Sequence, residues 1–354
     1  MFKSVSKSST LFIFMILCGF ACQSTSSRMS EQTDQMMTEQ TDQMTTEQTD
    51  QMPTSNNLDQ GNEQEPADQS TNDDVEIRAY RDLEYTTPPN VESDLAQLDI
   101  FRSDDDEVRP LVLLVHGGSW ASGDKAGFED KIVPWWIEQG YVAAPVNFRL
   151  ASRMRQTPVV KPADQVRDIA AALAWVMDHA EEYKIARDGV VLLGYSSGAH
   201  LVALLGTDES FVRAVGLEET QITASISFDV HAYDVPYALE LMEGSVVEQN
   251  IPIIRHLFGE SEEEQLSSSP ISFVDGWAAK ALIISVDEDP EEEGTHGYIV
   301  SKTAEHYVNA LTAAGHSADT FHDPSETHSS LVGGFGEAGD AVTEKVKAFL
   351  ETLP

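Results

Sequence analysis

From about residue 75 onward, hydrophobic and polar positions alternate between two patterns. Short apolar runs are typical of strands that are covered on both faces, and longer stretches with apolar residues at helical spacing are typical of helices. The predicted strands are 75–80, 95–102, 111–115, 141–146, 190–194, 222–228, 281–286 and 318–322, and the predicted helices are 132–139, 162–183, 197–205 and 340–350. This alternation predicts an α/β fold, with a mostly parallel central sheet and helices on both faces.

The stretch before this pattern lacks the apolar residues of a core. Residues 23–74 contain an eight-residue unit three times, as EQTDQMMT, EQTDQMTT and EQTDQMPT. Methionine is the only apolar residue in the unit, whereas repeats that stack into a solenoid need a buried apolar face. We therefore expect residues 23–74 to be a disordered acidic linker, and residues 75–354 to be the folded domain.

Residues 1–22 have the layout of an export signal, in which two lysines precede the apolar run 11–17. Such a run is shorter than the about 20 apolar residues that span a bilayer. The ending Gly-Phe-Ala-Cys resembles a bacterial lipoprotein signal with Cys22 as the lipidated residue. Because Gly19 stands where that signal usually has leucine, ordinary cleavage is the alternative. We expect an exported protein that is anchored in the cell envelope through this lipid, or is otherwise periplasmic or secreted.

Composition narrows the classes of partner. The net charge of −38 argues against nucleic acid, because the phosphates would be repelled. Both cysteines, Cys18 and Cys22, lie within the first 22 residues, so the folded domain has no disulfide, thiol nucleophile or cysteine metal site. We expect contact with a membrane only through the lipid on Cys22.

The sequence Gly194-Tyr195-Ser196-Ser197-Gly198 lies between a predicted strand and a predicted helix. A sharp turn at this place lifts a serine hydroxyl above the edge of the sheet, and the flanking glycines avoid clashes of Cβ atoms. Ser196 is therefore the candidate nucleophile. A structural serine in a glycine-rich turn is the alternative.

A second motif, His-Gly-Gly-Ser-Trp at residues 116–120, follows the predicted strand 111–115. A serine hydrolase needs N–H donors for the oxyanion of its tetrahedral intermediate, and glycines let a backbone come close enough to provide them. The candidate donors are the N–H groups of Gly117, Gly118 and Ser197. We expect Trp120 to line the substrate pocket.

HGGSW followed by GYSSGAH resembles the α/β-hydrolase esterases that include bacterial feruloyl and acetyl esterases and the kynurenine formamidases. The likeness spans residues 75–354 and includes LDIFR, WASGDK, VNFRL and SPISFV. It implies the α/β-hydrolase fold with a small cap, for which residues 233–276 are the candidate. It also implies Ser196 as nucleophile and gives Gly117, Gly118 and Ser197 the oxyanion role.

The chain order of the catalytic residues in this fold is serine, acid, histidine. The family has its acid in the loop after the predicted strand 281–286, which gives Asp289 that position here and leaves Asp287 as the second candidate. A calcium site and plain solvated charge are the alternatives for the acidic run DEDPEEE. His328 lies in the loop after the last predicted strand and is the expected histidine, whereas His316 and His322 are expected to be structural.

These residues predict a serine hydrolase that cleaves small carboxylic esters through an acyl-enzyme and needs no metal or organic cofactor. The expected substrate is a small-molecule or carbohydrate-linked ester. A formamidase and a catalytically inactive surface binding protein remain as alternatives. The export signal argues against the formamidase, because tryptophan breakdown belongs in the cytoplasm. The complete set of catalytic candidates argues against the binding protein.

Overall fold

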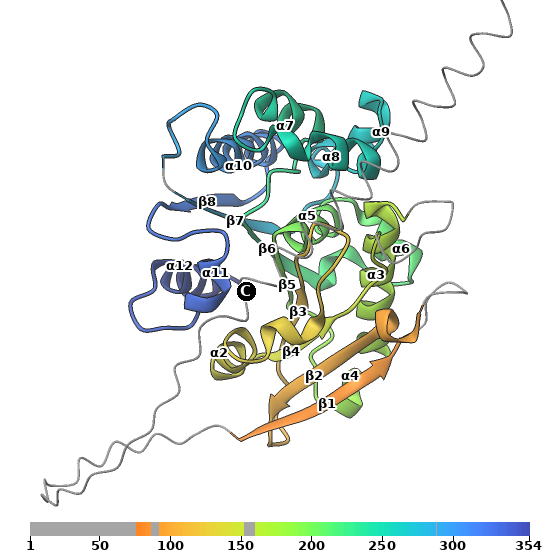
Figure 1. The fold of residues 1–354 in the computed structure, drawn as a ribbon. Helices are drawn as coiled ribbons and strands as arrows, with labels where there is room; N and C mark the ends of the chain where they lie inside the picture. Colours follow the sequence, from red (N-terminus) through yellow and green to blue (C-terminus); the bar gives the residue numbers. More distant parts are fainter. Residues whose placement is uncertain (1–75, 86–91, 152–159, 288) are drawn as a thin grey trace, which may run out of the picture. The chain divides into compact units, whose positions relative to one another are not determined.

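The computed structural model describes residues 76–85, 92–151, 160–287 and 289–354 (Figure 1). All of them belong to one unit of the chain, Gln69–Pro354. The predictions for the export signal, for Cys22 and for the repeat linker fall outside the described residues.

An eight-stranded sheet forms the centre of this unit, in the order β1-β2-β4-β3-β5-β6-β7-β8. The strands are β1 (Ile77–Glu84), β2 (Gln97–Ser103), β3 (Leu111–Val115), β4 (Val142–Val146), β5 (Val190–Tyr195), β6 (Ile222–Phe228), β7 (Lys280–Val286) and β8 (Ala318–Asp323). β2 runs antiparallel to β1 and β4, and every other neighbouring pair is parallel. The predicted mostly parallel sheet is confirmed.

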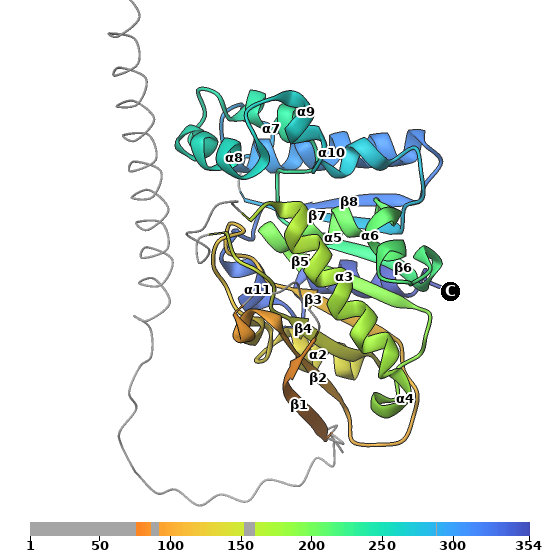
Figure 2. The same ribbon diagram turned by 90° about the vertical axis from the view of Figure 1, so that its right-hand side faces the viewer.

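Helices cover both faces of the sheet. They are α2 (Ile132–Glu138), α3 (Pro162–Asp178), α4 (Ala180–Tyr183), α5 (Ser197–Leu205), α6 (Glu209–Ala214), α7 (Val235–Met242), α8 (Ile251–Phe258), α9 (Glu262–Leu266), α10 (His296–Ala313), α11 (Ser330–Gly334) and α12 (Ala341–Leu350). The 3-10 turns are η1 (Ser93–Ala96), η2 (Lys125–Phe128), η3 (Glu219–Gln221), η4 (Glu248–Asn250) and η5 (Pro270–Phe273). Figures 1 and 2 show α2, α11 and α12 on one face and α3, α5 and α10 on the other. No helix of the described ranges is long and apolar enough to cross a membrane.

The central strands carry apolar residues on both faces because both faces are covered. All five residues of β3 are buried. Val112 and Leu114 point to the same side of this strand and pack in a cluster with Trp136 of α2 and Phe349 of α12. This core holds the carboxyl ends of the parallel strands in register, which is where an open α/β sheet places its ligands.

The structure has several helices that the sequence pattern did not predict, and two of the differences concern its longest helices. The predicted helix 162–183 is divided, because α3 ends at Asp178 and α4 follows it. The 18-residue helix α10 was not predicted, since its buried face includes glycine, serine, threonine and alanine and so has little hydrophobic periodicity. The expected cap, residues 233–276, lies between β6 and β7 and contains α7, α8 and α9, of which α7 contacts α10 (Figures 1 and 2).

We predict that Leu114→Ala lowers the free energy of unfolding by about 2–5 kcal/mol, because it leaves a cavity in this core. Urea denaturation of the purified protein measures the change. Val108→Ala is the control, since Val108 is 63% exposed and its truncation is expected to change stability by less than about 0.5 kcal/mol. Equal effects of the two substitutions would contradict the assignment of Leu114 to the core.

Candidate active site

Ser196 lies on a tight turn between β5 and α5, with φ 54° and ψ −125°. A non-glycine residue adopts such a conformation only where its surroundings hold it, and here the Ser196 N–H donates to the Phe228 carbonyl over 2.8 Å. The flanking glycines leave no room for a side chain. A Cβ atom on Gly194 would lie 2.2 Å from the Gly198 carbonyl oxygen, and one on Gly198 would lie 2.1 Å from that of Val115.

A continuous chain of hydrogen bonds joins Ser196, His328 and Asp229. Nε2 of His328 lies 3.1 Å from Ser196 Oγ, and Nδ1 lies 2.5 Å from Oδ2 of Asp229. The serine follows β5, the aspartate follows β6, and the histidine lies in the loop after β8. The parallel sheet thus brings together the two residues that the sequence predicted and a carboxylate that it did not.

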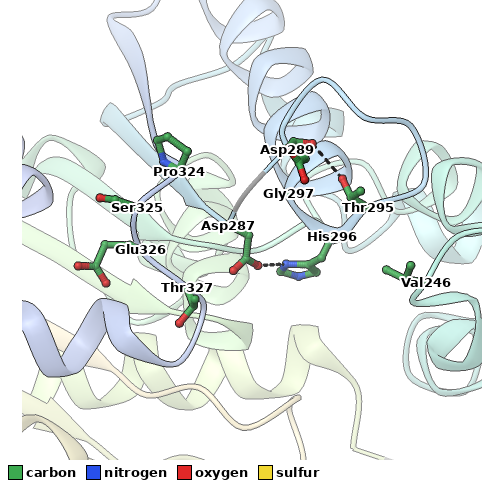
Figure 3. A pocket seen from close by; sticks show the side chains of 10 residues that line it. All are labelled: Val246, Asp287, Asp289, Thr295, His296, Gly297, Pro324, Ser325, Glu326 and Thr327. Atoms are coloured by element: carbon green, nitrogen blue, oxygen red, sulfur yellow. Dashed lines mark hydrogen bonds and ion pairs between the residues drawn. The ribbon is translucent and has the colours of Figure 1, made fainter.

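Asp289, the predicted acid, is not the carboxylate that bonds to His328, and this prediction is corrected. Asp289 is exposed, and its backbone carbonyl accepts a hydrogen bond from Thr295 Oγ1 over 3.0 Å, so its loop turns toward the start of α10 (Figure 3). Asp229 instead reaches the imidazole from the neighbouring strand end. Its side chain is fully buried, and Oδ1 accepts from the Val286 N–H over 3.1 Å.

A signal for Asp229 was present in the sequence. It directly follows the apolar strand β6, and a carboxylate at the carboxyl end of a buried strand is well placed for a site. The resemblance implied an acid in the loop after β7, so Asp229 in the loop after β6 was not among the predicted residues.

Asp287, the second candidate for the acid, contacts His328 differently. One carboxylate oxygen, Oδ1, lies 3.3 Å from the backbone N–H of His328, while Oδ2 accepts a hydrogen bond from Nδ1 of His296 (Figure 3). The hydrogen bond from His296 is the main influence that lowers the pKa of Asp287 below its usual value. Sequence analysis missed His296, since a lone histidine at a helix start has no distinguishing pattern.

Two of the three predicted oxyanion donors, Gly117 and Ser197, lie next to Ser196. A Cβ atom on Gly117 would come within 2.8 Å of Ser196 Cβ, so the loop after β3 runs directly against the nucleophile. Ser197 is the first residue of α5, where backbone N–H groups have no acceptor within the helix. Gly118 has φ 120°, which a side chain rarely tolerates, and its carbonyl accepts from Ala121 and Ser122.

His116 orders this loop, because its Nδ1–H donates to the Gly117 carbonyl over 2.8 Å and its ring stacks on Phe148 at 4.4 Å. Trp120, the predicted pocket wall, is only 4% exposed and packs edge-on against Phe258 of α8. It is a buried contact between the loop and the cap, and it does not line the cavity described below.

The indole N–H of Trp120 donates to Nδ1 of His200 over 3.2 Å, and Nε2–H of His200 donates to the Ser268 carbonyl over 2.8 Å. Burial lowers the pKa of His200 to about 4. The ring is therefore neutral near pH 7, as an acceptor at Nδ1 requires. This chain of hydrogen bonds joins the glycine loop to the segment that follows α9.

A cavity of about 410 Å³ opens beside the histidine loop, which is the loop after β8 that carries His328 (Figure 3). Its lining is rich in hydroxyl and carboxyl groups and comprises Val246, Asp287, Asp289, Thr295, His296, Gly297, Pro324, Ser325, Glu326 and Thr327. Val246 comes from the cap segment, so the cap forms part of the wall.

Asp229, Asp287 and His296 are the described residues that could together hold a metal ion, since one ligand atom of each lies within 4.8 Å of the others. Both carboxylates already accept hydrogen bonds from histidines, Asp229 from His328 and Asp287 from His296. Hydrogen bonding therefore accounts for the cluster.

Residues 98–296 match the model of the BD-FAE family. Among curated proteins, the chain is 30% identical over 166 residues to the probable carboxylic ester hydrolase LipM of Mycobacterium tuberculosis, covering 43% of this chain and 37% of LipM. It is 23% identical over 262 residues to esterase LipQ of the same organism, covering 72% of this chain and 59% of LipQ. The chain thus spans less than two thirds of the length of each of these relatives.

Two solved structures show the same fold. Esterase B from Lactobacillus rhamnosis aligns with a TM-score of 0.59 and 17% identity, over 77% of this chain and 84% of the other. A truncated carbohydrate esterase from gut microbiota aligns with a TM-score of 0.60 and 18% identity, over 79% and 97% of the two chains. The fold is the α/β-hydrolase fold that the motifs implied.

We predict that Gly117→Ala slows the reaction of Ser196 with a fluorophosphonate probe by about a hundredfold, because the new methyl group displaces the loop or the serine by roughly an ångström. The labelling rate of the purified protein measures this. Gly127→Ala is the matched control, since a Cβ atom there meets nothing within 4 Å. Equal labelling of both variants would contradict the close packing of the loop on Ser196.

Proposed function

The chain belongs to the BD-FAE family, and on that premise we propose that it is a serine hydrolase that cleaves small carboxylic esters through an acyl-enzyme. The observation that carries the proposal is the line of hydrogen bonds from Asp229 through His328 to Ser196. A nucleophile, a base within hydrogen-bond reach and a group that orients the base are the parts that acyl transfer needs.

Acylation follows from this geometry. Ser196 Oγ attacks the ester carbonyl carbon while Nε2 of His328 takes the hydroxyl proton. The carbonyl oxygen becomes an oxyanion, for which the N–H groups of Gly117, Gly118 and Ser197 are the proposed donors. His328 then gives its proton to the leaving alcohol oxygen as the carbon–oxygen bond breaks, which leaves the acyl group on Ser196.

Deacylation repeats these steps with water as the nucleophile. His328 takes a proton from the water, the hydroxide attacks the acyl carbon, and the proton returns to Ser196 Oγ as the carboxylic acid leaves. Asp229 keeps the proton on Nδ1 of His328, so that Nε2 is free to accept, and its charge stabilises the imidazolium. Its burial and its second hydrogen bond, from the Val286 N–H, hold the carboxylate in place for this role.

The substrate that we propose is a small-molecule or carbohydrate-linked ester. The cavity is lined by residues up to Thr327, which precedes His328 in the chain, and it supports this substrate because its hydroxyl and carboxyl groups can hydrogen-bond to a polar alcohol part. The names of the relatives, among them a carboxylic ester hydrolase and a carbohydrate esterase, agree with such a substrate.

We also propose export with lipid attachment at Cys22, which rests on the sequence alone. Cys22→Ser is expected to release the protein from the membrane fraction or to block its processing, because the thiol that would carry the lipid is lost. Fractionation of the expressing cells measures the distribution. The same membrane association in the variant as in the unaltered protein would favour ordinary cleavage.

We predict that Ser196→Ala lowers kcat for p-nitrophenyl acetate by about 10⁴-fold or more, because no acyl-enzyme can form. The initial rate of p-nitrophenol release measures the loss, and the circular dichroism spectrum checks that the fold is kept. Near-normal turnover in a folded variant would overturn the proposed function.

The acid is identified by comparing two matched substitutions. Asp229→Asn is expected to lower kcat by about 10⁴-fold, because an amide at this place favours the wrong tautomer of His328. Asp289→Asn makes the same chemical change on an exposed residue and is expected to cost less than about tenfold. The reverse result would place the acid after β7.

A further inference from the structure

We propose that Asp287 and His296 form a positioning pair for His328. Asp287 ties the loop that carries His328 to the end of β7, and His296 balances the charge of Asp287 beside the catalytic residues. This inference rests on the proposed function, because His328 matters here as the base. Neither residue contacts Ser196 in the described structure, so both act through His328.

Asp287 makes three hydrogen bonds to β8 and the loop after it. Its backbone N–H donates to the Glu326 carbonyl over 2.9 Å, its carbonyl accepts from Nε2 of His322 over 3.0 Å, and its Oδ1 accepts from the His328 N–H over 3.3 Å. The last of these bonds reaches the catalytic histidine itself. Loss of this carboxylate would therefore loosen the backbone from which the imidazole projects.

The backbone of Asp287 is held in an unfavourable conformation, with φ 81°. A non-glycine residue in this region costs free energy and persists where the surrounding contacts determine it. The three bonds to β8 and the loop after it are such contacts. The conformation directs one carboxylate oxygen toward His296 (Figure 3), while the other accepts from the His328 N–H.

His296 fixes the other oxygen of the same carboxylate. It is the first residue of α10, whose start is capped by Thr295 Oγ1, which accepts from the Tyr298 N–H over 3.1 Å. The His296 ring stands edge-on to that of His328, with 5.9 Å between the ring centres. A rigid helix end thus presents the histidine to Asp287.

Charge explains why a histidine is suited to this place. One oxygen of Asp229, one of Asp287 and a nitrogen of His296 lie within 4.8 Å of one another. Two carboxylates so close repel each other, and their negative charge lies beside the histidine that is proposed to act as base. A proton on His296 offsets one of the two charges.

The electrostatic environment of His296 agrees with this role. Burial, the largest influence, lowers the pKa of His296, but the hydrogen bond with Asp287 and the charges of Asp229 and Asp287 outweigh it and raise the pKa above 6.5. The titratable groups around it are Asp229 and His231 after β6, Asp287 and Asp289 after β7, and Glu326 and His328 after β8.

The test compares kcat, KM and their pH dependence for Asp287→Ala, Asp287→Asn and His296→Asn, with p-nitrophenyl acetate as substrate. Asp287→Ala removes the acceptor for the His328 N–H, and we expect kcat to fall by about a hundredfold with little change in KM. Asp287→Asn keeps an oxygen that can accept from the His328 N–H, and it is expected to retain most of the kcat that Asp287→Ala loses.

His296→Asn keeps a donor for Asp287 but cannot carry a proton. The uncompensated negative charge then favours the imidazolium form of His328, so the acidic limb of the kcat/KM profile is expected to move to higher pH by roughly 0.5 to 1 unit. A purely structural histidine would leave this limb in place. Glu293→Gln is the matched control, since it removes one exposed carboxylate from the same loop.

The pairing would be overturned if Asp287→Ala had the same kcat as Glu293→Gln. It would also be overturned if the acidic limb of the kcat/KM profile of His296→Asn lay at the same pH as in the unaltered protein. If Asp287→Ala does not fold, as judged by its melting temperature, His296→Asn tests the pairing through the position of the acidic limb. Ser196→Ala distinguishes a failure of the proposed function from a failure of the pairing alone. If it keeps full activity, the proposed function fails. If it is inactive while the Asp287 and His296 variants match the control, only the pairing fails.

Discussion

The close approach of three backbone segments is the constraint on which the site depends. The end of β3, the turn at Ser196 and the start of α5 touch where Gly194, Gly198 and Gly117 leave no space for a Cβ atom. Any side chain at these glycines would separate the strand ends. The contact gives Ser196 its unusual backbone conformation and brings the loop with the proposed oxyanion donors against it. Nucleophile and donors are thus placed by one packing contact before any substrate arrives.

The carboxyl ends of β6 and β7 each supply an aspartate, and each aspartate is bonded to a histidine. Asp229 bonds to His328, and Asp287 bonds to His296. The two carboxylates differ in environment, because Asp229 is fully buried and Asp287 is partly exposed at the cavity. Burial gives Asp229 a fixed geometry, while Asp287 reaches both the cavity and the backbone of the histidine loop. This difference in surroundings separates a carboxylate suited to orienting the base from one suited to holding its loop.

The cap is coupled to the site through a buried chain of polar contacts. Trp120 in the glycine loop bonds to His200 of α5, and His200 bonds to the carbonyl of Ser268 at the end of the cap's α9 region. Phe258 of α8 packs on both rings. A change in the cap would therefore act on the glycine loop as well as on the cavity wall that Val246 forms.

The sheet, the nucleophile turn and the glycine loop could be predicted from the amino-acid pattern alone, because they depend on neighbouring residues in the chain. Apolar runs predict covered strands. A serine between glycines at a strand end predicts one kind of turn, whatever the path of the rest of the chain. His328 was also found, since it lies in the loop after the last strand. The partner of His328 was decided by the tertiary structure. Asp229, Asp287 and Asp289 all follow strands of the same sheet, and only the twist of neighbouring strand ends and the turn toward α10 determine which carboxylate meets the imidazole. The burial of Trp120 and the pairing of His296 with Asp287 likewise arise between segments far apart in the chain, where no local pattern records them.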